Sequence, residues 1–399
     1  MSAASPCPRR PRILFVDDQR DVAVTLSKLL PKGSFECRFA DDGEAALTRL
    51  SAEAFDLAVV DLRMPPDDWG GLWLLRELSE RGLAIDTLVL SGEGGQSETI
   101  EAMRLAHDFV MKDKAAIELP ERIQDVLARS QRSRADFAVN QLPTPIALPY
   151  QRMQVPLDRE SQLRASLMTA EAVARFCALA AVSAIRTEGP LDQSVLTHLV
   201  RPSFGTWQEI CRRLLPQVRD RVLVRWIEAV CVTEANAVVQ HRNDVVHGGG
   251  APASGWDGAL ADVLGWLDWF VLTARTSTPL ELVVAGPMAF TGSTYSVDLA
   301  VLAGAAQSVA PVRADVATPL VTGRVYLQSA GGYVDMWPLV LADGAPTGDW
   351  TVKVVDGFQQ SRHGETSTTD RLKYVDLSTG ARDTSAQHQL GELLSGREP

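Results

Sequence analysis

Short apolar runs separated by amphipathic stretches constrain the fold of residues 12–131 more than any other feature of this chain. A run of four or five apolar residues is typical of a strand buried on both faces of a parallel sheet, and the intervening stretches have helical periodicity. Five such units predict an α/β fold with a doubly wound, five-stranded parallel sheet. The expected strands are 13–16, 35–39, 57–60, 87–90 and 109–111, and the expected helices are 20–30, 43–53, 71–81, 96–106 and 116–130.

Carboxylates follow two of these apolar runs directly. Asp17 and Asp18 come after the first run, and Asp61 comes after the third. Because right-handed crossovers place the carboxyl ends of parallel strands at one edge of the sheet, we expect the three carboxylates to lie close together. Carboxylates at contact distance repel one another unless a cation binds, and Mg²⁺ prefers oxygen ligands. The sequence therefore predicts a Mg²⁺ site formed by Asp17, Asp18 and Asp61.

Two further strand ends carry residues suited to phosphoryl transfer. Ser91 follows the fourth apolar run and Lys112 follows the fifth, so both belong at the same edge as Asp61. Asp61 can then act as the nucleophile, forming an aspartyl phosphate, while Lys112 and Mg²⁺ neutralise the developing charge. The Ser91 hydroxyl can bond a phosphoryl oxygen. The arrangement predicts that Asp61 accepts a phosphoryl group.

At these positions the sequence resembles a response-regulator receiver domain over residues 12–131. The matching residues stand at the strand ends: Asp17-Asp18, Asp61 with Met64-Pro65, Ser91-Gly92, and Phe109 three residues before Lys112. The resemblance implies a flavodoxin-like sheet with strand order 2-1-3-4-5. It implies phosphotransfer to Asp61 from a sensor histidine kinase or a phosphotransfer protein. It also implies that Ser91 and Phe109 move on phosphorylation and reshape the surface of the fourth helix, fifth strand and fifth helix.

The sequence departs from the family pattern at three places. Asp113 follows Lys112 where the family usually has Pro, and Leu105 takes a place that is often Gly. The loop after Pro65 is also longer than usual. These departures concern the output face more than the acceptor pocket. The alternative interpretation is a receiver-like fold that no longer takes phosphate.

After residue 131 the sequence pattern changes twice. Residues 132–160 contain four prolines and predict a linker or a segment lying along a surface. Residues 161–276 have helical periodicity and predict an all-α domain. From 280 to 380, short β-prone runs between Gly, Pro and Asp clusters predict a small antiparallel β-rich C-terminal domain.

A second candidate site lies at the end of a helix expected to run from Asp220 to His247, in the segment QHRNDVVHGGG. Its residues are Arg242, Asn243 and His247. A cation, an amide and an imidazole near a helix end can bind a phosphodiester, with the imidazole as acid or base. Arg242 and His247 stand about 140° apart round an ideal helix, so only the long Arg side chain can bring them together. Such a site would act without a metal and would use an RNA 2′-hydroxyl as the nucleophile.

The R-N-x-x-x-H pattern in a helical region resembles the HEPN superfamily, and SFGTW at 203–207 is similar to a helix start in some bacterial members. The resemblance implies that Arg242 and His247 are a catalytic ribonuclease pair, with Asn243 in the polar position after the Arg. It also implies a site formed across a homodimer. Two alternatives stay open: the cluster caps its helix, or the domain serves in binding or dimerisation.

Composition limits the other possibilities. No apolar run reaches the length of a membrane span, and residues 1–12 lack the apolar core of a signal peptide, so we expect a cytoplasmic protein with no membrane partner. The five cysteines are scattered and form no C-x-x-C pair, so neither a disulfide framework nor a zinc site is indicated. The net charge is −11, and the sequence has neither a basic stripe nor a helix-turn-helix signature that would favour DNA binding.

Together these features predict a bacterial two-component response regulator. Phosphorylation of Asp61 would control a HEPN-like effector that cuts RNA once two Arg242/His247 sites are brought together or uncovered. The alternative is a phosphorylation-controlled binding or dimerisation module without catalysis of its own.

Overall fold

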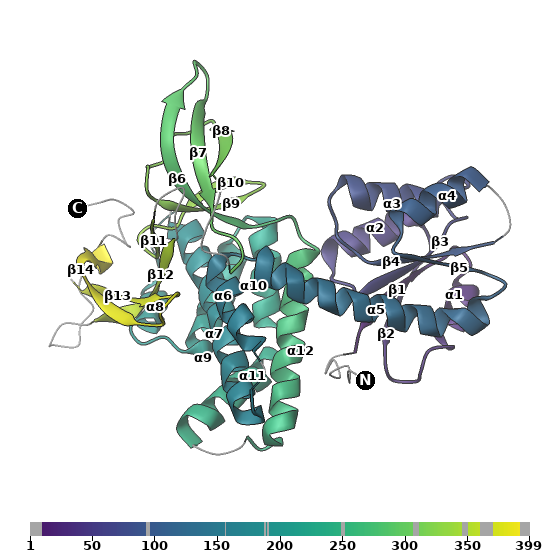
Figure 1. Ribbon diagram of the computed structural model, residues 1–399, viewed down its shortest axis with the longest axis horizontal. Coiled ribbons are helices and arrows are strands. Elements are labelled where there is room, and N and C mark those ends of the chain that lie inside the picture. The colour runs from purple at the N-terminus through teal and green to yellow at the C-terminus, as the bar shows by residue number, and fades with distance from the viewer. Residues whose placement is uncertain are drawn as a thin grey trace. The chain divides into compact units, whose positions relative to one another are not determined.

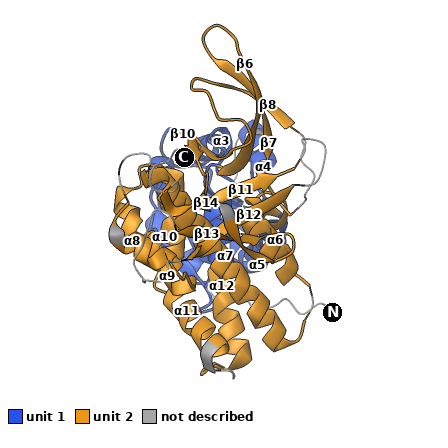
Figure 2. Ribbon diagram, turned by 90° about the vertical axis from the view of Figure 1, so that its left-hand side faces the viewer, with its two compact units in different colours: residues 1–136, 268–278 blue, residues 137–267, 279–399 orange. Residues whose placement is uncertain are grey.

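The chain divides into two compact units (Figure 2). The first unit holds residues 1–136 and 268–278, and the second holds 137–267 and 279–399. The computed structural model describes residues 10–92, 96–155, 157–186, 189, 191–248, 252–305, 311–344, 350–359 and 370–391.

The first unit is built on a parallel five-stranded sheet with strand order β2-β1-β3-β4-β5 (Figure 1). Its strands are β1 Arg12–Val16, β2 Glu36–Ala40, β3 Leu57–Asp61, β4 Thr87–Ser91 and β5 Asp108–Met111. The central strand β3 is buried along its whole length because helices cover both faces of the sheet. The predicted α/β fold and its strand order are confirmed.

Alternate residues of each strand point to opposite faces of this sheet and meet different helices. The helices are α1 Arg20–Ser27, α2 Gly43–Ala52, α3 Gly70–Glu80, α4 Gln96–Leu105 and α5 Ala115–Asn140. Phe15 and Val59 pack with Leu119 of α5 on one face, where α1 also contributes. Val60 packs with Leu74 of α3 on the other face, which α2 also covers, and α4 covers the neighbouring part of that face. These layers leave the carboxyl ends of the strands free to carry side chains of a site.

One more segment completes the first unit. Helix α12, Gly255–Arg275, belongs to the second unit up to Leu267, and from Asp268 onward it belongs to the first. The apolar pattern of the sequence does not indicate that residues 268–278 belong to the first unit, because such a pattern does not reveal which distant segment covers a surface.

The structure differs from the linker expected over 132–160. Helix α5 continues to Asn140, and α6, Thr144–Met153, follows after three residues. Most residues of α6 are buried. Two of the four prolines, Pro143 and Pro145, precede or begin α6, where a missing backbone N–H costs nothing. Pro143 and Pro145 therefore mark both the break after α5 and the start of α6.

The second unit begins with a helical layer around α7, Arg159–Arg186, most of whose residues are buried. Its other elements are α8 Gln193–Leu199, α9 Phe204–Leu214, the 3₁₀ turn η1 Leu215–Gln217, α10 Arg221–Cys231, α11 Ala235–Asn243 and the π-helical turn η2 Asp244–Gly248. Among the described residues, α7 alone is long and apolar enough to cross a membrane, but 78% of its apolar window is buried inside the structure. A core helix has the same properties.

The long helix expected from Asp220 to His247 is broken. Helix α10 ends at Cys231 because Val232 adopts an extended conformation, and α11 starts only at Ala235. The last turn, η2, is π-helical rather than α-helical. The ideal-helix angle used for Arg242 and His247 therefore does not describe this turn.

Two antiparallel sheets complete the second unit (Figure 1). The first sheet, in order β10-β9-β6-β7-β8, comprises β6 Glu281–Phe290, β7 Tyr295–Val301, β8 Pro311–Val316, β9 Val325–Ser329 and β10 Gly332–Asp335. The second, in order β11-β12-β13-β14, comprises β11 Val340–Asp343, β12 Thr351–Gln359, β13 Arg371–Asp376 and β14 Arg382–Gln389. The predicted order of helical and then antiparallel β structure is confirmed. Helices and sheets pack as one unit, with β12 lying against α6 and α8.

Candidate functional site

Three carboxylates meet at the carboxyl ends of β1 and β3. Ligand oxygens of Asp17, Asp18 and Asp61 all lie within 4.8 Å of one another. Asp17 and Asp61 are buried, whereas Asp18 is exposed. The Oδ1 atom of Asp17 accepts a hydrogen bond from the backbone N–H of Gln19 at 2.8 Å, but its buried Oδ2 atom accepts none from the described residues. A buried carboxylate oxygen without a hydrogen bond is suited to bind a cation, so the three carboxylates fit a Mg²⁺ site.

Lys112 brings one positive charge to this cluster. Its Nζ atom donates to Asp61 Oδ2 at 2.7 Å and lies 3.6 Å from Asp17 Oδ2. Burial raises the pKa of Asp61, and the hydrogen bond from Lys112 opposes that rise. The ammonium therefore helps to keep the buried carboxylate ionised, the form that a nucleophile needs.

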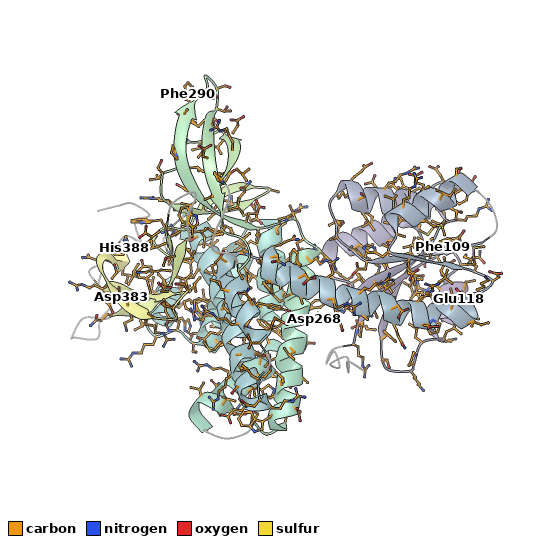
Figure 3. All side chains as sticks on the ribbon, in the orientation of Figure 1. Phe109, Glu118, Asp268, Phe290, Asp383 and His388 are labelled. Carbon is orange, nitrogen blue, oxygen red and sulfur yellow. The ribbon has the colours of Figure 1, made fainter. Side chains whose placement is uncertain are left out.

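Ser91 and Phe109 lie on the two strands beyond Asp61. Ser91 ends β4, where it is paired in register with Met111 of β5, and the Lys112 backbone N–H donates to the Ser91 carbonyl at 2.7 Å. The Ser91 hydroxyl donates to the carbonyl of Gly92 at 3.0 Å. Phe109 lies within β5 and is half-buried (Figure 3). All residues predicted for the pocket thus come from neighbouring strand ends, and the hydroxyl of Ser91 is bonded within its own loop.

Two glycines that sequence analysis did not single out shape the other side of the pocket. A Cβ atom on Gly71 would lie 2.0 Å from the carbonyl oxygen of Asp61, and one on Gly70 would lie 2.2 Å from that of Pro65. The backbone N–H of Gly71 donates to the Leu62 carbonyl at 3.2 Å. Only glycine lets the start of α3 approach the end of β3 so closely. The Gly-Gly pair that follows Pro65 is the feature of the sequence from which the close packing of α3 against β3 could have been predicted.

Comparison with known proteins agrees with this geometry. A family model described as the response regulator receiver domain matches residues 13–124. Residues 13–124 form a response regulator receiver domain. The domain is 32% identical over 120 residues to the transcriptional regulatory protein TctD of Salmonella typhimurium strain LT2, which covers 30% of this chain and 53% of that protein. It is 34% identical over 129 residues to the response regulator MprA of Mycobacterium leprae, covering 32% and 56%. The chain spans about half the length of the curated relatives it matches.

Solved receiver structures are also similar to this chain. The receiver domain of NtrX from Brucella abortus is 28% identical, covers 29% of this chain and 98% of its own, and has a TM-score of 0.27. A putative response regulator from Chloroflexus aurantiacus is 29% identical, covers 30% of this chain and 100% of its own, and has a TM-score of 0.28.

The second predicted site is described only in part. Arg242 is on α11 and Asn243, its last residue, is exposed. The backbone of His247 belongs to η2, but its side chain lies outside the described residues. The Nε atom of Arg242 lies 3.6 Å from Glu171 Oε2, and both side chains are about four-fifths buried. The Arg242 guanidinium therefore already has a carboxylate neighbour on α7.

Glu171 continues this contact into a chain of ion pairs within the second unit. Arg175, one turn along α7, lies 3.8 Å from Glu171 and 3.4 Å from Asp356 of β12. Asp356 in turn pairs with the exposed Arg382 of β14 at 2.8 Å. The network ties α11 and α7 to the second sheet. Each buried carboxylate in it faces at least one guanidinium, which is how structural charges are usually held.

The neighbouring His241 forms a pair that sequence analysis did not predict. Its Nε2 atom lies 2.8 Å from Asp262 Oδ2 on α12, while its buried Nδ1 atom has no hydrogen-bond partner in the part of the chain that the structure describes. The imidazole is almost wholly buried, whereas Asp262 is half exposed. This pair holds α11 against α12 one residue before Arg242.

Three cysteines of the helical layer are close enough to interact electrostatically. Cys177 and Cys211 are fully buried, and Cys231 is partly buried. Burial raises the pKa of all three thiols, that of Cys231 to about 11. A thiol with so high a pKa is almost wholly protonated at neutral pH and is a poor nucleophile. These cysteines act as core residues.

Proposed function

We propose that this chain is a two-component response regulator in which Asp61 accepts a phosphoryl group and the second unit carries the output. The observation that supports it is the imbalance of charge at the strand ends, where three carboxylates gather and, among the described residues, Lys112 is the cation that contacts two of them. Such a site favours a divalent cation and, with it, an incoming phosphoryl group. The partner that donates the group is a sensor histidine kinase or a phosphotransfer protein. Because receiver proteins are generally cytoplasmic, we place the reaction in the cytoplasm.

The transfer itself needs little covalent chemistry from the protein. An oxygen of Asp61 forms a bond to phosphorus while the bond from phosphorus to the donor's nitrogen breaks, and the leaving imidazole keeps the electron pair. Lys112 neutralises charge on the phosphoryl oxygens, and Ser91 can donate to one of them after its hydroxyl turns from the Gly92 carbonyl. Mg²⁺ held by the carboxylates would supply further positive charge.

Phosphoryl incorporation tests this proposal. Wild type incubated with Mg²⁺ and acetyl phosphate should gain one phosphoryl group per chain, and Asp61→Asn should gain none, by intact-mass spectrometry. The matched control is Asp68→Asn, an exposed carboxylate of the following loop, which should behave like wild type. Label persisting on Asp61→Asn would refute the assignment of the acceptor.

A ribonuclease output is the second part of the proposal, and the π-helical turn after Arg242 and Asn243 supports it, because such turns are frequent at functional sites. The RNA 2′-oxygen would attack the adjacent phosphorus and lose its proton to a base. The 5′-oxygen would leave with a proton from an acid, giving a 2′,3′-cyclic phosphate. His247 is proposed as the acid or base, and Arg242 as the cation on the phosphorane, with Asn243 beside them.

The competing output is a binding or dimerisation surface without catalysis, and the contact of Arg242 with Glu171 favours it. Cleavage of a labelled RNA, with and without beryllofluoride, separates the two. A ribonuclease would lose cleavage in His247→Ala and retain it in the control His198→Ala. Equal cleavage by all variants, or none by any, would leave binding as the output. Sedimentation with and without beryllofluoride tests the homodimer, and an unchanged mass would count against it.

A further inference from the structure

Asp86 forms a charged junction at the amino-terminal edge of the receiver sheet, opposite the acceptor pocket. It directly precedes β4 and is buried. Its Oδ2 atom lies 3.2 Å from Nη1 of Arg275, the last residue of α12, and its Oδ1 atom lies 3.1 Å from Nε2 of His107. One buried carboxylate thus joins the start of β4, the residue before β5 and the end of α12.

The hydrogen bonds of His107 define which nitrogen carries the proton. The backbone N–H of Thr87 donates to His107 Nδ1 at 3.1 Å, so Nδ1 accepts and is unprotonated. The proton therefore lies on Nε2, which donates to Asp86. The backbone N–H of His107 also donates to the Thr87 carbonyl at 2.9 Å. These bonds fix the imidazole between the starts of β4 and β5.

A second contact holds the same stretch of α12 to the same edge. Arg134 of α5 is 2% exposed and lies 3.2 Å from Asp56, which precedes β3, and 2.8 Å from Asp268 of α12 (Figure 3). The guanidinium of Arg12, which begins β1, lies 4.8 Å from the centre of the Trp269 ring. Residues that begin three strands therefore contact residues 268–275 directly or through Arg134.

The strands that start at the Asp86 junction lead at their other ends to Ser91 and Lys112 of the proposed acceptor pocket. β4 runs from Thr87 to Ser91, and β5 runs from Asp108 to Met111 and leads into Lys112. A shift of Ser91 or Lys112 on phosphorylation would reach Asp86 and His107 along β4 and β5, each of which is hydrogen-bonded to its neighbour in the sheet. Helix α12 continues from this contact into the second unit.

From this geometry we infer that residues 268–275 of α12 read the phosphorylation state of the receiver at the amino-terminal edge of its sheet, through the Asp86–Arg275 pair. The inference rests on the proposed function, since it requires that Asp61 takes the phosphoryl group. By linkage, a contact that responds to phosphorylation must also change the affinity of the pocket for a phosphoryl mimic.

The test is hydrogen exchange of the full chain with Mg²⁺, with and without beryllofluoride. In wild type, beryllofluoride should change amide exchange in 268–278 by about fivefold or more, the lower end of typical coupling. Asp86→Asn and Arg275→Met should abolish that change while β4 still responds. Arg275→Lys should restore part of it. The matched control is Arg81→Met, which removes an exposed ion pair with Glu77 on α3 and should respond like wild type.

Three results would overturn the inference. Variants that respond like wild type in 268–278 would refute the Asp86–Arg275 pair as the contact. A wild-type response in β4 without one in 268–278 would refute α12 as the reader while sparing the proposed function. No response at β4, together with no phosphoryl gain at Asp61, would refute the proposed function and the relay with it. If the single variants fail to fold, the double variant Asp86→Asn/Arg275→Met is used in their place. It removes both charges of the pair, so neither is left unpaired.

Discussion

The receiver pocket and the ion-pair network of the second unit hold their carboxylates in different ways. In the receiver pocket, three carboxylates lie together and Lys112 contacts two of them, Asp17 and Asp61. A buried oxygen of Asp17 accepts no hydrogen bond from the described residues. In the second unit, every buried carboxylate of the network has a guanidinium beside it. They are Glu171, which lies near Arg242 and Arg175, and Asp356, which lies near Arg175 and Arg382.

The difference separates a site with an excess of carboxylates from a network in which each carboxylate has a guanidinium neighbour. Unbalanced carboxylates cost free energy that a bound cation recovers, so their presence indicates function. A carboxylate that already has a guanidinium neighbour needs no bound cation, and breaking such a pair mainly leaves an unpaired charge. By this criterion the assignment of Asp61 is stronger than that of Arg242.

The largest expected effect comes from removing the single cation of the pocket. Lys112→Met should lower the rate of phosphoryl incorporation from acetyl phosphate by about 100-fold, because one group that stabilises transition-state charge is lost. Lys114→Met, an exposed lysine two residues away, is the control and should keep the wild-type rate. A rate for Lys112→Met within about twofold of wild type would contradict the interpretation of the receiver pocket as a functional site.

A smaller effect is expected on metal affinity. Asp17→Asn removes one proposed Mg²⁺ ligand and should weaken Mg²⁺ binding by about tenfold or more, measured by isothermal titration calorimetry. Asp21→Asn, on the exposed side of α1, should bind Mg²⁺ as wild type does. Equal affinities for the Asp17 and Asp21 variants would show that the carboxylate cluster does not hold the ion. Chelation with EDTA should stop phosphoryl incorporation in wild type.

The smallest effect tests whether the network is structural. A double-mutant cycle of Arg242→Met and Glu171→Gln should give a coupling of about 1 kcal/mol in the free energy of unfolding, because the pair is mostly buried but not ideally close. The control cycle uses Arg164 and Glu160, an exposed pair on α7, and should give less than about 0.5 kcal/mol. If the two couplings are equal, Arg242 is not held by Glu171 and is freer to act on a ligand.

The receiver could be predicted well because its signals are local. Each apolar run that ends in Asp17, Asp61 or Lys112 specifies both a strand and the position of its polar end, and parallel topology then brings those ends together. The structure of the second unit was harder to predict from the sequence. Val232 interrupts the expected helix, and most of residues 132–153 are helical although Pro145 and Pro149 lie in α6, because buried contacts outweigh local propensity.

By itself the sequence determined the five-stranded parallel sheet and gathered the polar strand ends at one edge, because strand periodicity and chain direction suffice for both, while the resemblance to receiver domains supplied the strand order. Only the tertiary structure decided the partners of charges far apart in the chain. Asp86 meets Arg275 across 189 positions, and Glu171 meets Arg242 across a bundle of helices. Such pairs depend on how whole helices and strands pack. The sequence around Asp86 or Glu171 therefore does not predict which arginine lies beside the carboxylate.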